Sequence, residues 1–198
     1  SNGAAAPCEG GADNPARTLM SIPNSQLQYQ LVRQAQGFSL QLREGAPIRP
    51  PGLREALVRV RATSLNRRDI SVLKGFYPVG KRETLVPLSD GAGEVVAVGP
   101  GATRVKPGDR VAATFFQAWA SGRPTPQTGP SALGGGLDGL LAQYVTLSEE
   151  GLVPVPEHLS LEDAACLPCA AVTAWSGLVT RGRMQPGEAV HVHGAAGG

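Results

Sequence analysis

The chain has 198 residues, of which 26 are glycine and 17 are proline, with 41% hydrophobic and 17% charged residues. This composition is typical of a globular, loop-rich chain with much β-structure. Glycine has no three-residue period, which excludes collagen, and several apolar runs long enough to pack exclude a disordered chain. The 18 basic and 16 acidic residues are not clustered and give a net charge of +2, so nothing favours nucleic-acid or membrane-surface binding. There is also no apolar stretch of about 18 residues that could span a membrane.

Residues 1–24 are small and polar and lack the apolar core of a secretory signal. We interpret them as a tag remnant and a disordered leader. Arg17, in a segment with few carboxylates, leaves an organelle transit peptide open. Three cysteines, Cys8, Cys166 and Cys169, are too few and too unevenly placed for a disulfide scaffold. The sequence therefore predicts a reducing, cytoplasmic location.

Alternating apolar and polar residues, separated by glycine and proline turns, predict a series of strands. The predicted strands lie within residues 27–32, 38–43, 55–65, 91–102, 105–114 and 140–147. Gly37 is expected in the first turn. A short helix is predicted over Asn66–Lys74, with Asn66 as its N-cap and Gly75 as its C-cap. Gly122–Gly139 is expected to be a long loop.

Residues 158–179 predict helical structure, because Ser160 can cap a helix whose first turn is acidic and whose next residues are apolar. Pro168 interrupts this run, so we expect two helices or one kinked helix. Residues 185–198 predict a turn, a strand and the start of a glycine-rich loop. Such a loop is typical of a phosphate-binding turn, although a flexible end would give the same pattern.

Four motifs in this order resemble the medium-chain dehydrogenase/reductase superfamily, and specifically its zinc-independent, quinone-oxidoreductase-like branch. They occupy residues 55–75, 85–111, 167–175 and 185–198. The resemblance implies a mainly β GroES-like barrel with a few helices over residues 25–155. Residues 156–198 would then hold connecting helices and the first strand and glycine loop of a truncated α/β Rossmann nucleotide-binding domain.

The resemblance also bears on zinc. Zinc-dependent members of the superfamily place a cysteine where this chain has Asn66, a histidine at Ser89 and a cysteine at Cys169. One suitable ligand of three cannot hold tetrahedral zinc. The long loop also lacks the four close cysteines of a structural zinc lobe. The resemblance therefore implies that no zinc is bound.

Two other motifs suggest different chemistry. Cys166 and Cys169 form a C-x-x-C pair, as in thioredoxin-like redox sites, but they lie within an alanine-rich helical run. We interpret them as small buried hydrophobic residues. His191 and His193 alternate on one face of the last predicted strand. They have no acidic or cysteine partner nearby, which favours a structural role over a metal site.

In the superfamily the substrate lies between the barrel and the nucleotide domain. By resemblance, Asn66 would bond the substrate oxygen or a nicotinamide ribose, and Tyr77 would donate its O–H to the substrate. Helix capping and ordinary packing are the structural alternatives. Arg67 matches a position that contacts the cofactor pyrophosphate, and Thr173 one that lies near the nicotinamide. The candidate cofactor-binding residues are Arg67, Thr173, Gly194, Ala195, Ala196, Gly197 and Gly198.

Two neighbours of Arg67 have less defined roles. Arg68 lies where zinc-dependent members carry a hydroxyl for proton relay, so the resemblance does not support such a relay here. Asp69 could orient Arg67, Arg68 or a nearby backbone amide, and a plain first-turn carboxylate is equally compatible with its position.

These features predict an NAD(P)H-dependent oxidoreductase that transfers a hydride to or from a carbonyl, quinone or enone, with NADPH slightly favoured. The expected partners are a small-molecule substrate and a second copy of the protein in a homodimer, but not nucleic acid or a membrane. Two alternatives remain open: a truncated or inactive fragment that acts only through protein partners, and a GroES-like structural module. Residues 1–198 alone are expected to show little activity, because most of the dinucleotide surface would follow Gly198.

Overall fold

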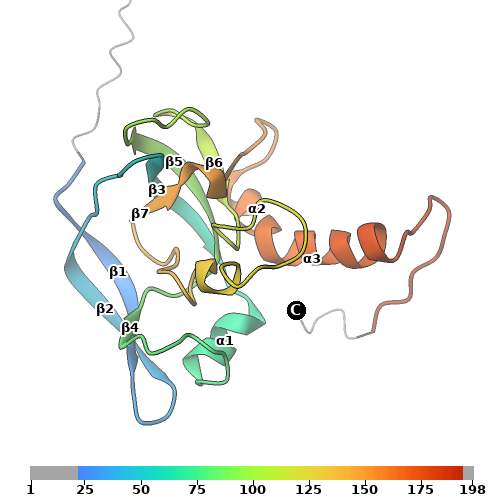
Figure 1. Ribbon diagram of the computed structural model, residues 1–198, viewed down its shortest axis with the longest axis horizontal. Helices are drawn as coiled ribbons and strands as arrows, with labels where there is room; N and C mark the ends of the chain where they lie inside the picture. The colour runs from blue at the N-terminus through green and yellow to red at the C-terminus, as the bar shows by residue number, and fades with distance from the viewer. Residues whose placement is uncertain (1–21, 194–198) are drawn as a thin grey trace, which may run out of the picture.

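The computed structural model describes residues 22–193, which form a barrel of two antiparallel sheets and a helical segment that extends away from it (Figure 1). The strands are β1 Ser25–Arg33, β2 Phe38–Pro47, β3 Glu55–Ser64, β4 Thr84–Leu85, β5 Asp90–Val98, β6 Arg110–Ala113, β7 Tyr144–Ser148 and β8 Leu152–Pro154. The smaller sheet has the order β2-β1-β4 and the larger β7-β3-β5-β6-β8. The predicted mainly β barrel is confirmed.

The helices are short. The α-helices are α1 Arg67–Leu73, α2 Leu161–Ala165 and α3 Val172–Trp175; 3-10 turns cover Gly129–Ser131 and Glu149–Gly151, and π-helical turns cover Leu167–Ala171 and Ser176–Arg181. The first of the π-helical turns contains Pro168, which lacks the N–H that a regular α-helix would need at this position. The predicted interruption of the helical run at Pro168 is therefore confirmed.

The main core lies on the inner face of the larger sheet, between its strands and the long loop. Its strands alternate inward and outward side chains, and their inward residues meet apolar side chains from the long loop. The buried members are Ala56, Val58, Val95, Val105, Val111, Ala113, Leu133, Leu140, Leu147 and Leu152. Burial of each leucine or valine contributes about 1.5–3 kcal/mol. This core fixes the loop that carries Leu133 against the strands, which matters for the site below.

The strand predicted over residues 140–147 begins only at Tyr144. Before it, the backbone N–H groups of Leu140 and Leu141 donate to the carbonyl oxygens of Leu88 and Pro87 at 3.0 and 3.2 Å. These bonds tie Leu140 and Leu141 to the segment before β5, and the stretch reaches β3 only at Gln143, whose carbonyl oxygen accepts from the Val60 N–H. The prediction was therefore wrong by four residues, because a contact distant in sequence takes the backbone groups of this stretch.

Helix α1 and the turn between β1 and β2 touch through two glycines. Gly37 and Gly75 both have positive φ, at 69° and 75°. A Cβ added to Gly75 would lie 2.9 Å from the Gly37 Cα, and a Cβ on Gly37 would lie 2.6 Å from the Leu73 carbonyl oxygen. The contact therefore needs glycine for space as well as for conformation. Gly37 occupies the turn as predicted, whereas Lys74 is the C-cap and Gly75 follows it.

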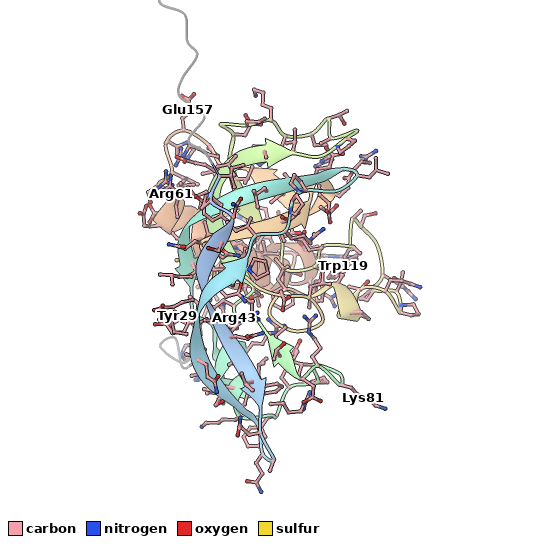
Figure 2. The ribbon with its side chains drawn as sticks, turned by 90° about the vertical axis from the view of Figure 1, so that its left-hand side faces the viewer. Tyr29, Arg43, Arg61, Lys81, Trp119 and Glu157 are labelled. Atoms are coloured by element: carbon pink, nitrogen blue, oxygen red, sulfur yellow. The ribbon has the colours of Figure 1, made fainter. Side chains whose placement is uncertain are left out.

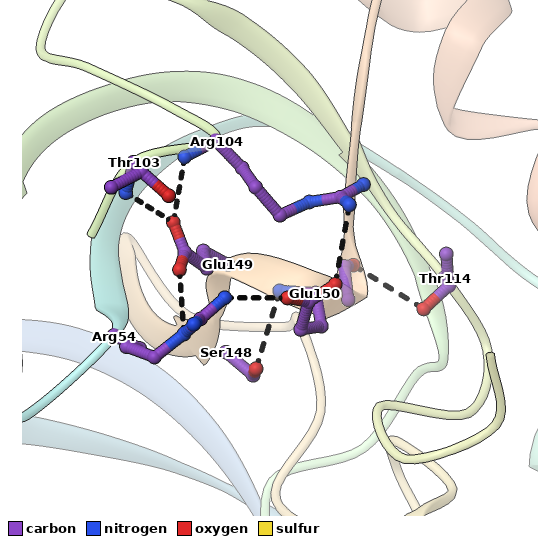
Figure 3. Close-up of polar contacts among 8 residues, drawn as sticks. Arg54, Thr103, Arg104, Thr114, Ser148, Glu149 and Glu150 are labelled. Atoms are coloured by element: carbon purple, nitrogen blue, oxygen red, sulfur yellow. Dashed lines mark hydrogen bonds and ion pairs between the residues drawn. The ribbon is translucent and has the colours of Figure 1, made fainter. Parts of the chain in front are cut away.

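A fully buried carboxylate, that of Glu149, supports the other end of the barrel (Figure 3). One of its oxygens accepts hydrogen bonds from the backbone N–H groups of Thr103 and Arg104 at 2.7 and 2.8 Å. Its other oxygen lies 2.9 Å from Arg54 Nε. Glu150 is half-exposed and pairs with both arginines at the surface. The two backbone bonds hold the pKa of Glu149 below its ordinary value, although burial opposes this shift.

The helical segment is joined to the barrel mainly by α2. Ser160 caps α2 as predicted, its hydroxyl accepting from the Asp163 N–H at 3.0 Å. Ala164 and Ala165 pack on Ala92 of β5. The strand predicted within residues 185–198 does not form at residues 189–193, because among the described residues no strand lies beside it to share hydrogen bonds. His191 and His193 instead stack, with ring centroids 4.3 Å apart.

The β1–β2 hairpin presents several apolar side chains to solvent, among them Tyr29 (Figure 2). Together with residues of β3 and of the end of the long loop, these side chains line an open groove that contains none of the predicted site residues. No helix within residues 22–193 is long and apolar enough to cross a membrane.

Candidate functional site

The first turn of α1 brings two of the predicted residues into defined positions. Asn66 caps the helix, and its backbone N–H donates to the Asp69 carboxylate at 2.8 Å. The Asn66 side-chain nitrogen Nδ2 is shielded from water and has no acceptor among the described residues. Asp69 is therefore the residue that orients the backbone at Asn66. The amide of Asn66 remains available for another bond.

Arg68 follows directly and is held on three sides. Its Nη1 donates to the Leu133 carbonyl oxygen at 2.8 Å. The Tyr77 and Phe115 rings each lie against the guanidinium, with their centroids 4.7 and 4.6 Å from Cζ. Gly135 touches its edge, since a Cβ there would lie 2.3 Å from Nη2. The Arg68 side chain is therefore held in place by residues from the loop after α1, the loop after β6 and the long loop.

Two nitrogens of the same guanidinium, Nε and Nη2, are shielded from water and have no acceptor among residues 22–193. A buried donor that lacks a bond costs about 1–3 kcal/mol, and more when it is charged. Arg68 and Asn66 thus place three unpaired donor nitrogens within three residues of the chain. A buried polar group without a partner needs an explanation, and a catalytic role or a bound molecule is one.

The start of β5 joins the helical segment through a buried carboxylate. Asp90 is fully buried and accepts from the backbone N–H of Cys169 at 2.9 Å and from the Ser89 hydroxyl at 2.9 Å. Both oxygens of this carboxylate therefore have protein donors. Through this bond Cys169 is held at the start of β5, although it is 79 residues away from Asp90 in sequence.

The pKa values of Cys169 and Asp69 are shifted by their burial and by the charges of neighbouring residues. Burial, and then the negative charge of Asp90, raises the pKa of the Cys169 thiol, whereas Arg68 and a hydrogen bond with Thr173 lower it. Burial also raises the pKa of Asp69, and the backbone bond from Asn66 and the charge of Arg68 oppose this shift. Cys169, Asp90, Asp69 and Arg68 therefore lie within electrostatic range of one another and form one site.

The residues at this site do not fit a zinc ion. The Asp90 carboxylate is used by two protein donors, Asn66 and Ser89 are poor zinc ligands, and Arg68 brings a fixed positive charge that would repel a cation. Within residues 22–193, no three His, Cys, Asp or Glu side chains are placed to share a metal ion. Of the three positions compared above, only Cys169 offers a suitable zinc ligand.

The predicted site residues are only partly brought together. Tyr77 is half-buried and contacts Arg68 as well as the core around α1, so its packing and site roles coexist. Arg67 is exposed at the start of α1, and its side chain bonds to none of the described residues. Thr173 is exposed on α3. The predicted glycine loop, Gly194, Ala195, Ala196, Gly197 and Gly198, lies outside the described residues.

The C-x-x-C pair was interpreted as buried, which is wrong for Cys166. This residue is exposed at the end of α2, and its Sγ contacts the Glu162 carbonyl oxygen at 3.5 Å. Cys169 is half-buried. The difference arises because the helical run extends away from the barrel, which therefore covers only its α2 end (Figure 1).

Sequence reasoning missed three members of the site. Arg68 was noted only because it replaces the hydroxyl residue of a proton relay. Asp90 follows Ser89, which occupies a zinc-ligand position, but was given no role, and Phe115 was not considered. No spacing rule connects these residues, because β5, α1 and the loop after β6 meet only in the folded barrel. The one available signal was a run of aromatic residues, Phe115, Phe116 and Trp119, beside a strand.

Comparison with known proteins gives a family match. Residues 52–157 match the family model of the alcohol dehydrogenase GroES-like domain. The zinc-type alcohol dehydrogenase-like protein of Schizosaccharomyces pombe is 43% identical over 145 residues, which are 72% of this chain and 42% of that protein.

Solved structures of dehydrogenases and oxidoreductases are also similar to this chain. A protein assigned as an alcohol dehydrogenase from Sinorhizobium meliloti 1021 has a TM-score of 0.76 at 38% identity and covers 84% of this chain and 50% of its own. A quinone oxidoreductase from Pseudomonas syringae has a TM-score of 0.65 at 27% identity, covering 82% and 43%. The chain spans about half the length of the curated relatives it matches.

Proposed function

Because this chain belongs to the medium-chain dehydrogenase/reductase superfamily through its alcohol dehydrogenase GroES-like domain, we propose that it supplies the substrate side of an NAD(P)H-dependent oxidoreductase. The reaction is a hydride transfer between the nicotinamide and a carbonyl, quinone or enone, without zinc. The fragment and structural-module alternatives receive no support from the relatives, which are named as dehydrogenases and oxidoreductases.

The observation that carries the zinc-free part of the proposal is the bond from the Cys169 N–H to Asp90 beside the Arg68 guanidinium. A catalytic zinc ion needs three protein ligands and an open position. Here a carboxylate, an amide and a guanidinium occupy that part of the site. Polarisation of the substrate oxygen must then come from hydrogen-bond donors, which can supply a large share of transition-state stabilisation when they are held in place.

A bound nicotinamide would supply the hydride, while this chain's own residues bind and orient. The exposed Arg67 side chain suits a pyrophosphate, because a guanidinium fork donates two parallel bonds to an anion. The exposed Thr173 hydroxyl can donate to the nicotinamide. The Tyr77 and Phe115 rings form an apolar wall beside Arg68 that would limit water around the reacting carbonyl.

The whole protein, expressed from its complete gene, provides the test. We expect elemental analysis to find no stoichiometric zinc, and reduction of an enone or quinone by NADPH to continue after dialysis against a chelator. A bound zinc whose removal abolishes turnover would contradict the zinc-free mechanism. Failure to transfer deuteride from labelled NADPH or NADH to aldehydes, quinones and enones would contradict the oxidoreductase assignment itself.

A further inference from the structure

Arg68 has the features of a ligand-binding cation rather than those of a structural one. A structural arginine in a protein interior is normally paired with a carboxylate. Within residues 22–193, Arg68 donates one side-chain hydrogen bond, from Nη1 to the neutral Leu133 carbonyl oxygen, and its Nε and Nη2 have no acceptor there. Two aromatic rings cover the guanidinium faces. Its edge therefore keeps unused donors.

The adjacent groups indicate which ligand would complete this edge. Asn66 Nδ2, two residues away, is a further shielded and unpaired donor. Because the unpaired groups are all hydrogen-bond donors, the ligand that completes them should be an acceptor. A guanidinium binds most strongly to an acceptor that carries negative charge. Asp69 and Asp90 add negative charge to the same site. An oxygen that became negative there would be repelled unless Arg68 compensated for it.

We propose that Arg68 and Asn66 form the binding site for the substrate oxygen as it gains negative charge during reduction. The inference rests on the proposed function. The hydride adds to the carbonyl carbon, or to the β-carbon of an enone, and the π electrons move onto oxygen to give an alkoxide or enolate. Arg68 and Asn66 donate hydrogen bonds to that oxygen. A proton from water then gives the alcohol, or protonates the enolate to the saturated ketone, and the oxidised cofactor is released.

The rings determine how the oxygen reaches the guanidinium. Tyr77 and Phe115 belong to loops, and both side chains are half-buried. A planar enone or quinone that stacked beside these rings would bring its oxygen toward the edge of the Arg68 guanidinium. Gly135 leaves little space at Nη2, because an added Cβ there would lie 2.3 Å from that nitrogen. We therefore expect flat, unsaturated carbonyl substrates to be accommodated better than branched aliphatic ones.

The test uses benzoate as a stable mimic of the charged oxygen and benzamide as its neutral counterpart. Binding of each to the whole protein with NADP+ would be measured by calorimetry. We expect Arg68→Met to weaken benzoate binding about tenfold or more, while benzamide binding changes less than about threefold. NADP+ affinity should be unchanged. The matched control is Arg61→Met, which removes an arginine paired with Glu94 on the barrel surface.

Further variants keep the test decisive if Arg68→Met does not fold. Arg68→Lys retains the charge but not the planar fork, and should weaken benzoate binding by about threefold to tenfold. Asn66→Asp places a like charge at the site and should reduce benzoate binding more than benzamide binding. Equal benzoate affinity in wild-type protein and in the Arg68 variants, or no benzoate binding by the wild type, would overturn the proposal.

The two proposals fail differently. Benzoate binding that depends on Arg68, without hydride transfer to any carbonyl, would refute the proposed function but leave the anion site intact. Hydride transfer that persists at the wild-type kcat in Arg68→Met would refute the oxyanion role and leave the oxidoreductase assignment intact.

Discussion

The carboxylate of Asp90 accepts a hydrogen bond from the backbone N–H of Cys169 at 2.9 Å. This contact joins the first residue of β5 to the helical segment, in addition to the packing of α2 on the barrel. Because Asp90 also accepts from Ser89, it satisfies two donors in a fully buried place. The contact therefore fixes Cys169 and, one turn later, Thr173 relative to the residues of α1.

Replacement of Asp90 by asparagine should destabilise the protein by about 1–3 kcal/mol. An asparagine has one acceptor oxygen, so its NH₂ group would face either Ser89 or the Cys169 N–H and leave a buried donor unpaired. Denaturant unfolding measures the effect. Ser89→Ala, which removes a donor and leaves the bond to Cys169, should cost less. Equal stability of Asp90→Asn and wild-type protein would show that this contact does not hold the helical segment.

The stability of the barrel should depend on pH through Glu149. Because the folded-state pKa lies below the ordinary value of 4.5, the ionised carboxylate stabilises the fold. This contribution is fully present above the unfolded-state pKa and is lost as the pH falls through the lower folded-state pKa. We therefore expect Glu149→Gln to lower Tm most above about pH 5, with the difference shrinking in acid.

The matched control for that experiment is Glu150→Gln. Glu150 is adjacent in sequence and pairs with the same two arginines, but it is half-exposed. Its removal should change Tm little at any pH, because exposed ion pairs contribute about 1 kcal/mol or less. A pH-independent difference between wild-type protein and Glu149→Gln would mean that the buried carboxylate does not titrate as its contacts require.

Much of the fold could be predicted from local pattern. Alternation placed β1, β2, β3 and β5, Gly37 marked the first turn, and Ser160 capped α2, because each of these features depends on neighbours close in sequence. Predictions failed where distant contacts decide. The start of β7 moved because Leu140 bonds to Leu88, and residues 189–193 lack a strand partner among the described residues.

The site was less predictable than the fold. Resemblance pointed to Asn66 and Tyr77; Tyr77 lies against Arg68 and Asn66 caps the same helix, while their catalytic roles stay predictions. The pairing of Asp90 with Cys169 links positions 79 residues apart, and the aromatic contacts of Arg68 require a loop after β6. Neither is encoded by spacing along the chain. The sequence indicated that Asn66 and Ser89 are poor zinc ligands, but the unpaired donor nitrogens of Asn66 and Arg68 became visible only in three dimensions.

Gly135 should be needed because of Arg68. A Cβ at this position would meet Arg68 Nη2 at 2.3 Å and nothing else closer than 3.6 Å. Gly135→Ala should therefore displace the guanidinium, destabilise the protein by about 1–3 kcal/mol and lower kcat of the whole enzyme. In an Arg68→Met background the same alanine should cost much less, so the two substitutions should be non-additive in unfolding experiments.

Gly129 provides the control for that cycle, because a Cβ there would have open space around it. Gly129→Ala should change stability by less than about 0.5 kcal/mol in either background. Additive effects of Gly135→Ala and Arg68→Met would show that the glycine is required by the backbone and not by the guanidinium.

Arg67 should act on the cofactor rather than on the substrate oxygen. It neighbours Arg68 in sequence, yet its side chain is exposed and bonds to none of the described residues, whereas that of Arg68 is held between two rings. Loss of a charge-assisted bond to a pyrophosphate costs about 1.5–3 kcal/mol, so Arg67→Ala should weaken NADPH binding by the whole protein roughly tenfold to a hundredfold.

Benzoate binding to the NADP+-saturated protein should be unchanged in Arg67→Ala. The control is Lys81→Ala, which removes an exposed cation in the loop after α1 and should leave both affinities as they are. Fluorescence titration with NADPH gives the first affinity and calorimetry the second. If Arg67→Ala impaired benzoate binding while NADPH binding stayed intact, the division of labour between the two adjacent arginines would be the reverse of the one their surroundings indicate.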